Sequence, residues 1–72
     1  MSGLKKRSLV LAGHATSVAL EPEFWVVLEA MARDRSLSLA GVVAEIDAGR
    51  GARALTSACR VAALAFAGRS GQ

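Results

Sequence analysis

The segment that most constrains this fold is a short strand pattern that runs directly into the start of a helix. Residues 16–20, TSVAL, alternate between the two faces of a strand. Val18 and Leu20 share one face, which we expect to pack on the core. A lone strand leaves a row of backbone N–H and C=O groups unpaired, so it needs a partner. The simplest partner is the same strand of a second chain, antiparallel across a two-fold axis.

The residues before this strand allow more than one arrangement. We interpret residues 1–6 as a flexible basic arm and residues 7–20 as extended chain. Leu9 and Leu11 continue the alternation, either as a second strand or as an extension of the first. The Ala12-Gly13-His14 sequence can turn or loosen the chain between them. Both arrangements agree with the sequence.

Three helices follow, and local signals mark where the first two begin. The first, residues 22–34, opens with Pro22, whose missing N–H costs nothing in a first turn. The second, residues 38–48, starts at Ser38, a favourable N-cap residue. The third is predicted over residues 55–67. Together these elements predict a single mainly α domain, residues 1–72, with a short β ribbon.

Composition limits how such a domain is stabilised. The chain has 72 residues, 53% of them hydrophobic, with one cysteine and one histidine. One cysteine excludes an internal disulfide, and the two residues are too few for a structural zinc site, so we expect no metal and no cofactor. So much apolar surface on so short a chain indicates association with a second copy of itself.

The charge and the N-terminal region bear on partners and location. A formal net charge of +3 permits a nucleic acid partner. No apolar run reaches the roughly 20 residues that a membrane span needs, so we expect no membrane partner. The basic stretch at Lys5 imitates a signal peptide, but His14, Thr16 and Ser17 end the apolar region too early. These features favour a cytoplasmic protein.

Five short motifs occur in order between Lys6 and Phe66. They are a KRS start, a TSVxLExxFW strand-to-helix junction, a Ser-Leu helix start, an EID helix end and an SxxR third helix. In this ordered set the chain resembles the short bacterial ribbon-helix-helix domains. The resemblance implies strand-helix-helix topology, here with an extra C-terminal helix. It also implies an intertwined homodimer whose intermolecular antiparallel ribbon lies in the DNA major groove. Many members are transcriptional repressors, and some are antitoxins.

The resemblance assigns functional positions as well. Base-reading side chains would lie on the strand face away from the core, at Ala15, Ser17 and Ala19. Phosphates would meet the start of the second helix and the basic arm, through Lys5, Lys6, Arg7, Arg35, Ser36 and Ser38. The expected dimer core comprises Val18, Leu20, Phe24, Leu28, Val42, Val43 and Ile46. Family members usually carry longer polar side chains on the ribbon face than these two alanines and one serine.

That departure keeps a second class of function open, a dimeric protein-interaction module with little DNA specificity. In this reading Trp25 and the apolar third helix would dock another protein, although we expect Trp25 to pack against the third helix or the dimer mate. An enzyme is not indicated. Cys59 lies in an apolar helical stripe, and the GRG segment lacks the spacing of a phosphate-binding loop. We therefore expect no catalytic residues.

Overall fold

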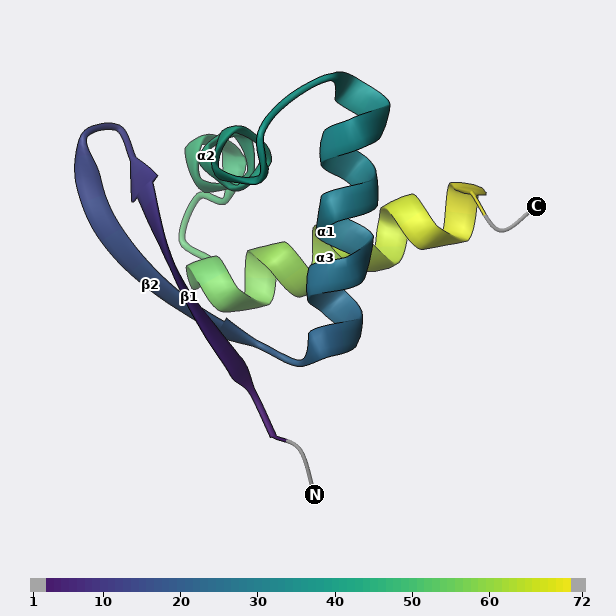
Figure 1. The fold of residues 1–72 in the computed structure, drawn as a ribbon, viewed down its shortest axis with the longest axis horizontal. Coiled ribbons are helices and arrows are strands. Elements are labelled where there is room, and N and C mark those ends of the chain that lie inside the picture. The colour runs from purple at the N-terminus through teal and green to yellow at the C-terminus, as the bar shows by residue number, and fades with distance from the viewer. Residues whose placement is uncertain (1–2, 71–72) are drawn as a thin grey trace.

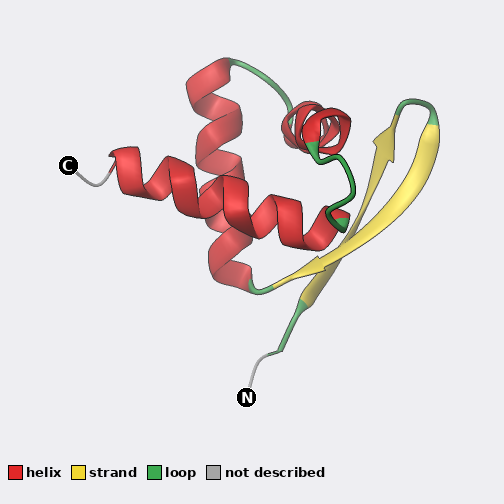
Figure 2. Ribbon diagram, turned by 180° about the vertical axis from the view of Figure 1, so that it is seen from behind, coloured by secondary structure: helices red, strands yellow, loops and turns green. Residues whose placement is uncertain are grey.

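A two-stranded ribbon packs against three helices in the computed structural model, which describes residues 3–70 (Figures 1 and 2). The side chain of residue 70 is outside this description, as is the start of the predicted basic arm at residues 1–2. In chain order the elements are β1 (Lys5–Leu11), β2 (His14–Leu20), α1 (Pro22–Arg35), α2 (Leu39–Gly49) and α3 (Leu55–Ser70). The predicted ribbon-helix-helix architecture with an added C-terminal helix is confirmed.

The ribbon forms within one chain. β1 pairs antiparallel with β2, from Lys5 opposite Leu20 to Leu11 opposite His14. Residues 5–11 are therefore a second strand, and Lys5 and Lys6 belong to β1 and not to a flexible arm. The premise that β2 lacks a partner in its own chain was wrong, because β1 supplies that partner. The sequence pattern of residues 7–11 had left open whether they form a second strand.

A two-residue turn makes this pairing possible. Ala12 has a φ of 52° and Gly13 a φ of 83°. Two consecutive positive φ values are typical of the type I′ turn, whose twist matches that of the flanking strands. Glycine occupies such a position without strain, whereas alanine carries a steric cost there. The turn is thus compatible with a hairpin but not optimal for one.

Helix α1 begins at Pro22 and ends in a left-handed residue. Ser36 has a φ of 56°, and its N–H donates to the Arg33 carbonyl while the next N–H, of Leu37, donates to Ala32. These bonds satisfy carbonyls at the helix end and turn the chain toward α2. Helix α2 then starts at Ser38, whose Oγ accepts a hydrogen bond of 3.0 Å from the Gly41 N–H.

Glycine at position 41 allows this cap to close. A Cβ added there would lie 3.3 Å from Ser38 Oγ and 3.5 Å from Leu37 Cβ, closer to the hydroxyl than most real contacts. A larger residue would therefore press on the capping side chain. The conformation of the loop between α1 and α2 is therefore determined by contacts among residues within a few positions of one another.

The core lies between the inner face of the ribbon and the helices. Figures 1 and 2 show α3 crossing α1, with α2 and the start of α3 next to the hairpin. The predicted core residues Val18, Leu20, Leu28, Val42 and Val43 are buried in the single chain, and Phe24 and Ile46 are partly buried against them. Their burial does not require a second copy. Among the helices of residues 3–70, none is both long and apolar enough to cross a membrane.

Candidate nucleic-acid interface

The face of the ribbon turned away from the helices brings together residues from both strands. Ala15 and Ser17 are exposed there and Ala19 is half-buried, as the alternation along β2 predicted. The register adds their cross-strand partners, so that the face consists of the pairs Val10–Ala15, Ser8–Ser17 and Lys6–Ala19. Sequence reasoning missed Ser8 and Val10 because β1 was not assigned as a strand. Their alternation with Arg7, Leu9 and Leu11 was the available signal.

Most side chains on this ribbon face are small, some are polar, and none is acidic. Ser8 and Ser17 face each other at its centre, with their Oγ atoms 3.4 Å apart. Hydroxyl groups both donate and accept, so the pair can meet several kinds of base edge. Val10 is 66% exposed and supplies methyl groups beside Ala15. Because Lys6 is the only long side chain among these six residues, a base edge could approach the centre of the ribbon closely.

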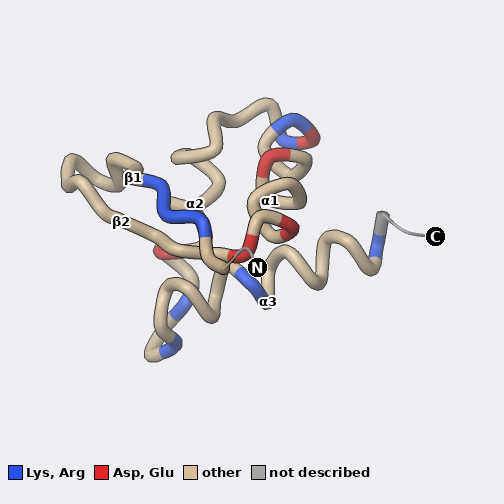
Figure 3. The backbone as a smooth tube through the Cα atoms, turned by 60° about the horizontal axis from the view of Figure 1, so that its bottom comes forward, with Lys and Arg blue, Asp and Glu red and all other residues tan. Residues whose placement is uncertain are grey.

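β1 begins with three basic residues, blue on the backbone tube in Figure 3, and their side chains have different environments. The Lys5 and Lys6 side chains make no ion pair among residues 3–70. Arg7 lies on the opposite side of the strand from Lys6, where Nη1 donates to Glu29 Oε2 at 2.9 Å. Its guanidinium also lies 5.2 Å from the centroid of the Trp25 ring. Arg7 thus joins β1 to α1, which competes with its predicted role as a phosphate contact.

Trp25 anchors the same junction. Its ring is 3% exposed, and Nε1 donates a 2.7 Å hydrogen bond to the Lys5 carbonyl. Trp25 therefore contacts β1, a neighbour that the sequence spacing did not predict. A shallow hollow beside it is lined by Lys5, Arg7, Pro22, Trp25, Val26 and Glu29. A buried tryptophan does not offer an anchor for a protein partner.

The junction of α1 and α2 holds the other predicted phosphate contacts. Arg35 Nη1 lies 2.7 Å from Glu45 Oε1, so its charge is partly committed to an ion pair with α2. Ser38 Oγ caps the Gly41 N–H, while the first two N–H groups of α2, at Leu39 and Ala40, precede the capped one and have no intrahelical acceptor. The junction thus has free backbone donors but a partly neutralised arginine.

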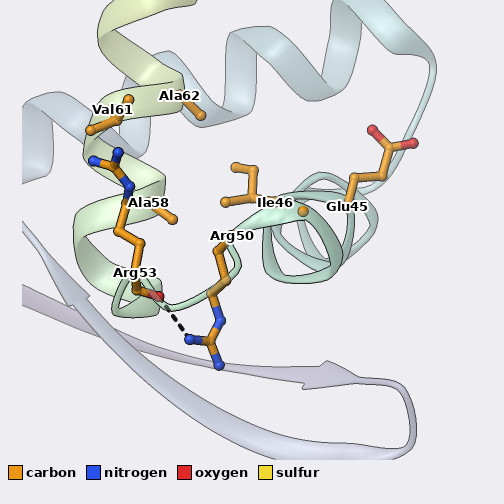
Figure 4. A pocket seen from close by; sticks show the side chains of 8 residues that line it. Glu45, Ile46, Arg50, Arg53, Ala58, Val61 and Ala62 are labelled. Carbon is orange, nitrogen blue, oxygen red and sulfur yellow. Dashed lines mark hydrogen bonds between the residues drawn. The ribbon is translucent and has the colours of Figure 1, made fainter.

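A second hollow, of about 360 Å³, lies between α2 and α3 (Figure 4). Its arginines are not arranged as a catalytic or binding cluster. Arg50 Nε lies 2.6 Å from Asp47 Oδ1, and Nη1 donates to the Arg53 carbonyl at 2.8 Å. The side chain of Ile46 lies at the centre of the lining, and the side chain of Glu45 points away from the hollow. The hollow is open, and the Glu45 and Arg50 side chains are paired with Arg35 and Asp47, so its polar groups do not converge as they would in a reaction site.

Cys59 and His14, the other candidate reactive residues, lie in different elements of the fold. Cys59 is fully buried in α3, where burial, and to a smaller extent the negative charge of Asp47, raise the pKa of its thiol. A raised pKa disfavours the nucleophilic thiolate. His14 is exposed beside the hairpin turn. Within residues 3–70 no three His, Cys, Asp or Glu side chains are grouped so as to hold a metal ion.

Comparison with known proteins identifies the domain. Neither curated proteins nor solved structures give a match to this chain. A family model described as "Ribbon-helix-helix domain" matches residues 4–67, which covers the ribbon, both following helices and most of α3. On this match, and with a hairpin followed by helices in the expected order, the chain belongs to the ribbon-helix-helix domain family.

Proposed function

We propose that this protein binds double-stranded DNA through the outer face of its ribbon and acts as a transcriptional regulator. The observation that carries the proposal is the register of the hairpin, which puts Lys6, Ser8 and Ser17 on one exposed face two strands wide. A two-stranded ribbon fits the major groove, where each base pair presents a distinct pattern of donors and acceptors. Ribbon-helix-helix domains are generally DNA-binding transcription regulators or antitoxins.

The distribution of charge supports the same face. All six acidic residues lie between positions 21 and 47, so neither strand carries one, while β1 carries three basic residues. Four of the acids are paired with arginines, at Glu21, Glu29, Glu45 and Asp47. Lys5 and Lys6 keep their charge available for phosphates, which dominate the affinity of most proteins for DNA.

The start of α2 is the second part of the proposal. The N–H groups of Leu39 and Ala40, with the positive end of the helix dipole, favour a phosphate oxygen there. Ser36 and Ser38 lie at the same junction, and Arg35 would exchange part of its contact with Glu45 for the phosphate. We propose these groups as positioning contacts, which carry no base information.

A homodimer belongs to the proposal, since ribbon-helix-helix domains typically dimerise. Because the ribbon is complete within one chain, the dimer would form through another surface. Val61 is 46% exposed and Leu64 71% exposed on α3, and Val26 is 64% exposed on α1. Val61 and Leu64 are three residues apart and so lie on the same side of α3, where together they form an exposed apolar surface of the kind that supports association. Sedimentation over a range of concentrations measures the oligomeric state directly.

The proposed DNA binding is tested by selecting genomic DNA fragments with the purified protein at near-physiological salt. We expect recurrent enrichment of one sequence, with binding that weakens as salt is added. Lys6→Ala should lower the affinity for that sequence. Arg69→Ala removes the same charge near the far end of α3, which extends away from the hairpin (Figure 1), and should leave binding unchanged.

Equal, weak binding to every fragment would contradict sequence-dependent recognition and leave only attraction to phosphates. The rival function would then be favoured, a dimeric module that binds another protein, antitoxin-like or as an adaptor. The exposed Val61 and Leu64 support that rival, whereas the buried Trp25 does not. Under either function we propose a non-enzymatic cytoplasmic protein, in keeping with the typically non-enzymatic, regulatory character of ribbon-helix-helix domains.

A further inference from the structure

We propose that the hollow between the start of β1 and α1 binds a small carboxylate that has a compact apolar body. This hollow has a volume of about 270 Å³ and is lined by Lys5, Arg7, Pro22, Trp25, Val26 and Glu29. The inference concerns a second site, beyond the proposed DNA binding, and does not depend on it.

The hollow lies on the face of β1 opposite the candidate nucleic-acid interface. Side chains alternate along a strand, so Lys5 and Arg7 share the face toward the helices while Lys6 is on the outer face. The contacts of Arg7 with Glu29 and Trp25 place this inner face against α1. A ligand in the hollow would therefore contact both β1 and α1 and would leave the outer face of the ribbon uncovered.

The charges of the lining favour a ligand with a single negative charge. Lys5 and Arg7 supply two positive charges against the one negative charge of Glu29. The Lys5 ammonium group has no ion pair among residues 3–70. Arg7 is 35% exposed and uses only Nη1 to reach Glu29, although a guanidinium group has five N–H donors. One net positive charge and several unused donors thus border the hollow.

Among anions, a carboxylate fits these donors best. Its two oxygens match the planar fork of a guanidinium group and accept two parallel hydrogen bonds from it. The Lys5 ammonium group would add a point charge beside the same oxygens. A phosphate monoester carries a charge of roughly −1.5 to −2 at neutral pH, which exceeds the single net charge of the lining.

The rest of the lining favours an apolar body on the same ligand. Pro22 and Val26 are exposed, and the Val26 side chain is 64% accessible to solvent. A ligand that covers them removes apolar surface from water, which is favourable. Small-molecule sites typically enclose about 300–1,000 Å³, so a hollow of about 270 Å³ admits only a compact body.

Trp25 makes the proposal directly measurable. It is the only tryptophan of a chain without tyrosine, so the fluorescence of the full chain reports on this hollow. We expect a saturable change in emission on titration with cyclohexanecarboxylate at fixed ionic strength. The melting temperature should rise as well, because the ligand binds the folded state. Cyclohexanecarboxamide, which lacks the charge, should bind at least about tenfold more weakly. Acetate, which lacks the apolar ring, should do the same.

Variants assign the binding to the hollow. Lys5→Ala should weaken it at least about tenfold, since a hydrogen bond to a charged group is lost. Lys6→Ala removes the same charge from the same strand, but on the outer face, and should leave binding unchanged. Val26→Asp places a negative charge in the apolar wall at an exposed position and should abolish binding. Circular dichroism checks that each variant is folded.

Three results would overturn the inference. An unchanged emission together with an unchanged melting temperature would show that the hollow holds no such ligand. An equal affinity for acetate would reduce the contact to the attraction of any anion by positive charge. Binding that persists in both Lys5→Ala and Val26→Asp would place the ligand elsewhere on the chain. None of these measurements uses DNA, so the proposed DNA binding is tested separately.

Discussion

At the scale of single residues, Trp25 holds the ribbon to the helices. The chain itself connects β2 to α1, but β1 has no such connection. Trp25 provides it through the hydrogen bond from Nε1 to the Lys5 carbonyl, and its ring lies under the guanidinium of Arg7. Arg7 in turn pairs with Glu29 of α1. The pairing is half-exposed and contributes little alone, so most of this attachment comes from the buried ring.

Trp25→Phe should therefore lower the free energy of unfolding by roughly 1–3 kcal/mol, since it removes one hydrogen bond and part of a buried ring. Urea denaturation followed by circular dichroism measures the change. Val26→Ala at the adjacent, exposed position is the control and should shift stability by less than about 0.5 kcal/mol. Equal effects of the two substitutions would show that Trp25 does not anchor β1.

Cys59 gives a second prediction at this scale. Burial raises the pKa of its thiol and also blocks access, so the folded protein should react slowly with a thiol reagent at neutral pH. We expect the rate of modification to rise with urea in parallel with unfolding. Rapid modification of the native protein, without loss of its circular dichroism signal, would contradict the buried position of this side chain.

At the scale of elements, the pairing of β1 with β2 depends on the hairpin turn, and the residues of this turn are not the most favourable ones for its conformation. Ala12 adopts a φ of 52° that favours glycine or asparagine. The steric cost is modest, on the order of 1 kcal/mol, and cross-strand pairing outweighs it. The pairing of the two flanking strands thus offsets the steric cost at Ala12.

Ala12→Asn creates the Asn-Gly sequence that type I′ turns prefer, and it should stabilise the protein by about 0.5–1 kcal/mol. Thermal and urea unfolding both report the gain. Ala15→Asn places the same substitution on the exposed face of β2, where asparagine is unfavourable, and should not stabilise. If Ala12→Asn destabilised the protein, the turn would have a different backbone conformation.

The contact between the start of α1 and α3 predicts a pH dependence. Arg60 Nε donates to Glu21 Oε1 at 3.0 Å, and this hydrogen bond holds the pKa of the Glu21 carboxyl below its usual range. A carboxyl with a lowered pKa in the folded state contributes stability at neutral pH, and that contribution is lost as the pH falls through the folded pKa. The pair therefore weakens in acid.

Glu21→Gln should accordingly reduce stability at neutral pH and have little effect in strong acid, where Glu21 is already protonated. The midpoints of urea unfolding of the wild type and the variant, measured from neutral pH to strong acid, test this difference in stability. Glu23→Gln removes the same charge from the same turn, but Glu23 has no ion pair among residues 3–70. A loss of stability in Glu21→Gln that is constant at all pH values would argue against the ion pair.

At the scale of the whole molecule, one chain contains a complete ribbon and a complete core. Leu20, Leu28, Val42 and Val43 are fully buried without a second copy. The surface left over is mixed, with basic residues along β1 and exposed apolar residues on α3. In the single chain the ribbon and the core are thus both formed without a partner, whereas the sequence suggested strands exchanged between two chains.

Cysteines at Ser8 and Ser17, which face each other across the ribbon, test whether it closes within one chain. In a Cys59→Ala background, the double variant Ser8→Cys/Ser17→Cys should oxidise to a disulfide-linked monomer. A mixture of the two single variants should give no specific crosslink between Ser8→Cys and Ser17→Cys chains. Efficient formation of that mixed dimer on a non-reducing gel would show that strands are exchanged between chains.

What the sequence determined by itself was local. Pro22 and Ser38 marked the helix starts, alternation placed Val18 and Leu20 inside, and the ordered motifs indicated the family. Apart from the order of the motifs, which spans Lys6 to Phe66, these signals depend on residues within a few positions of one another. The candidate base-facing residues of β2 were predicted in the same way.

Only the tertiary structure decided which segment pairs with β2, and from this followed the positions of Lys6, Ser8 and Val10. It also turned Arg7 toward Glu29 and placed Trp25 against β1. The physical reason is that a strand's hydrogen bonds are satisfied equally well by any antiparallel partner of matching pattern. The choice between a partner in the same chain and one in another chain depends on turn geometry and packing across the whole molecule, which no local pattern contains.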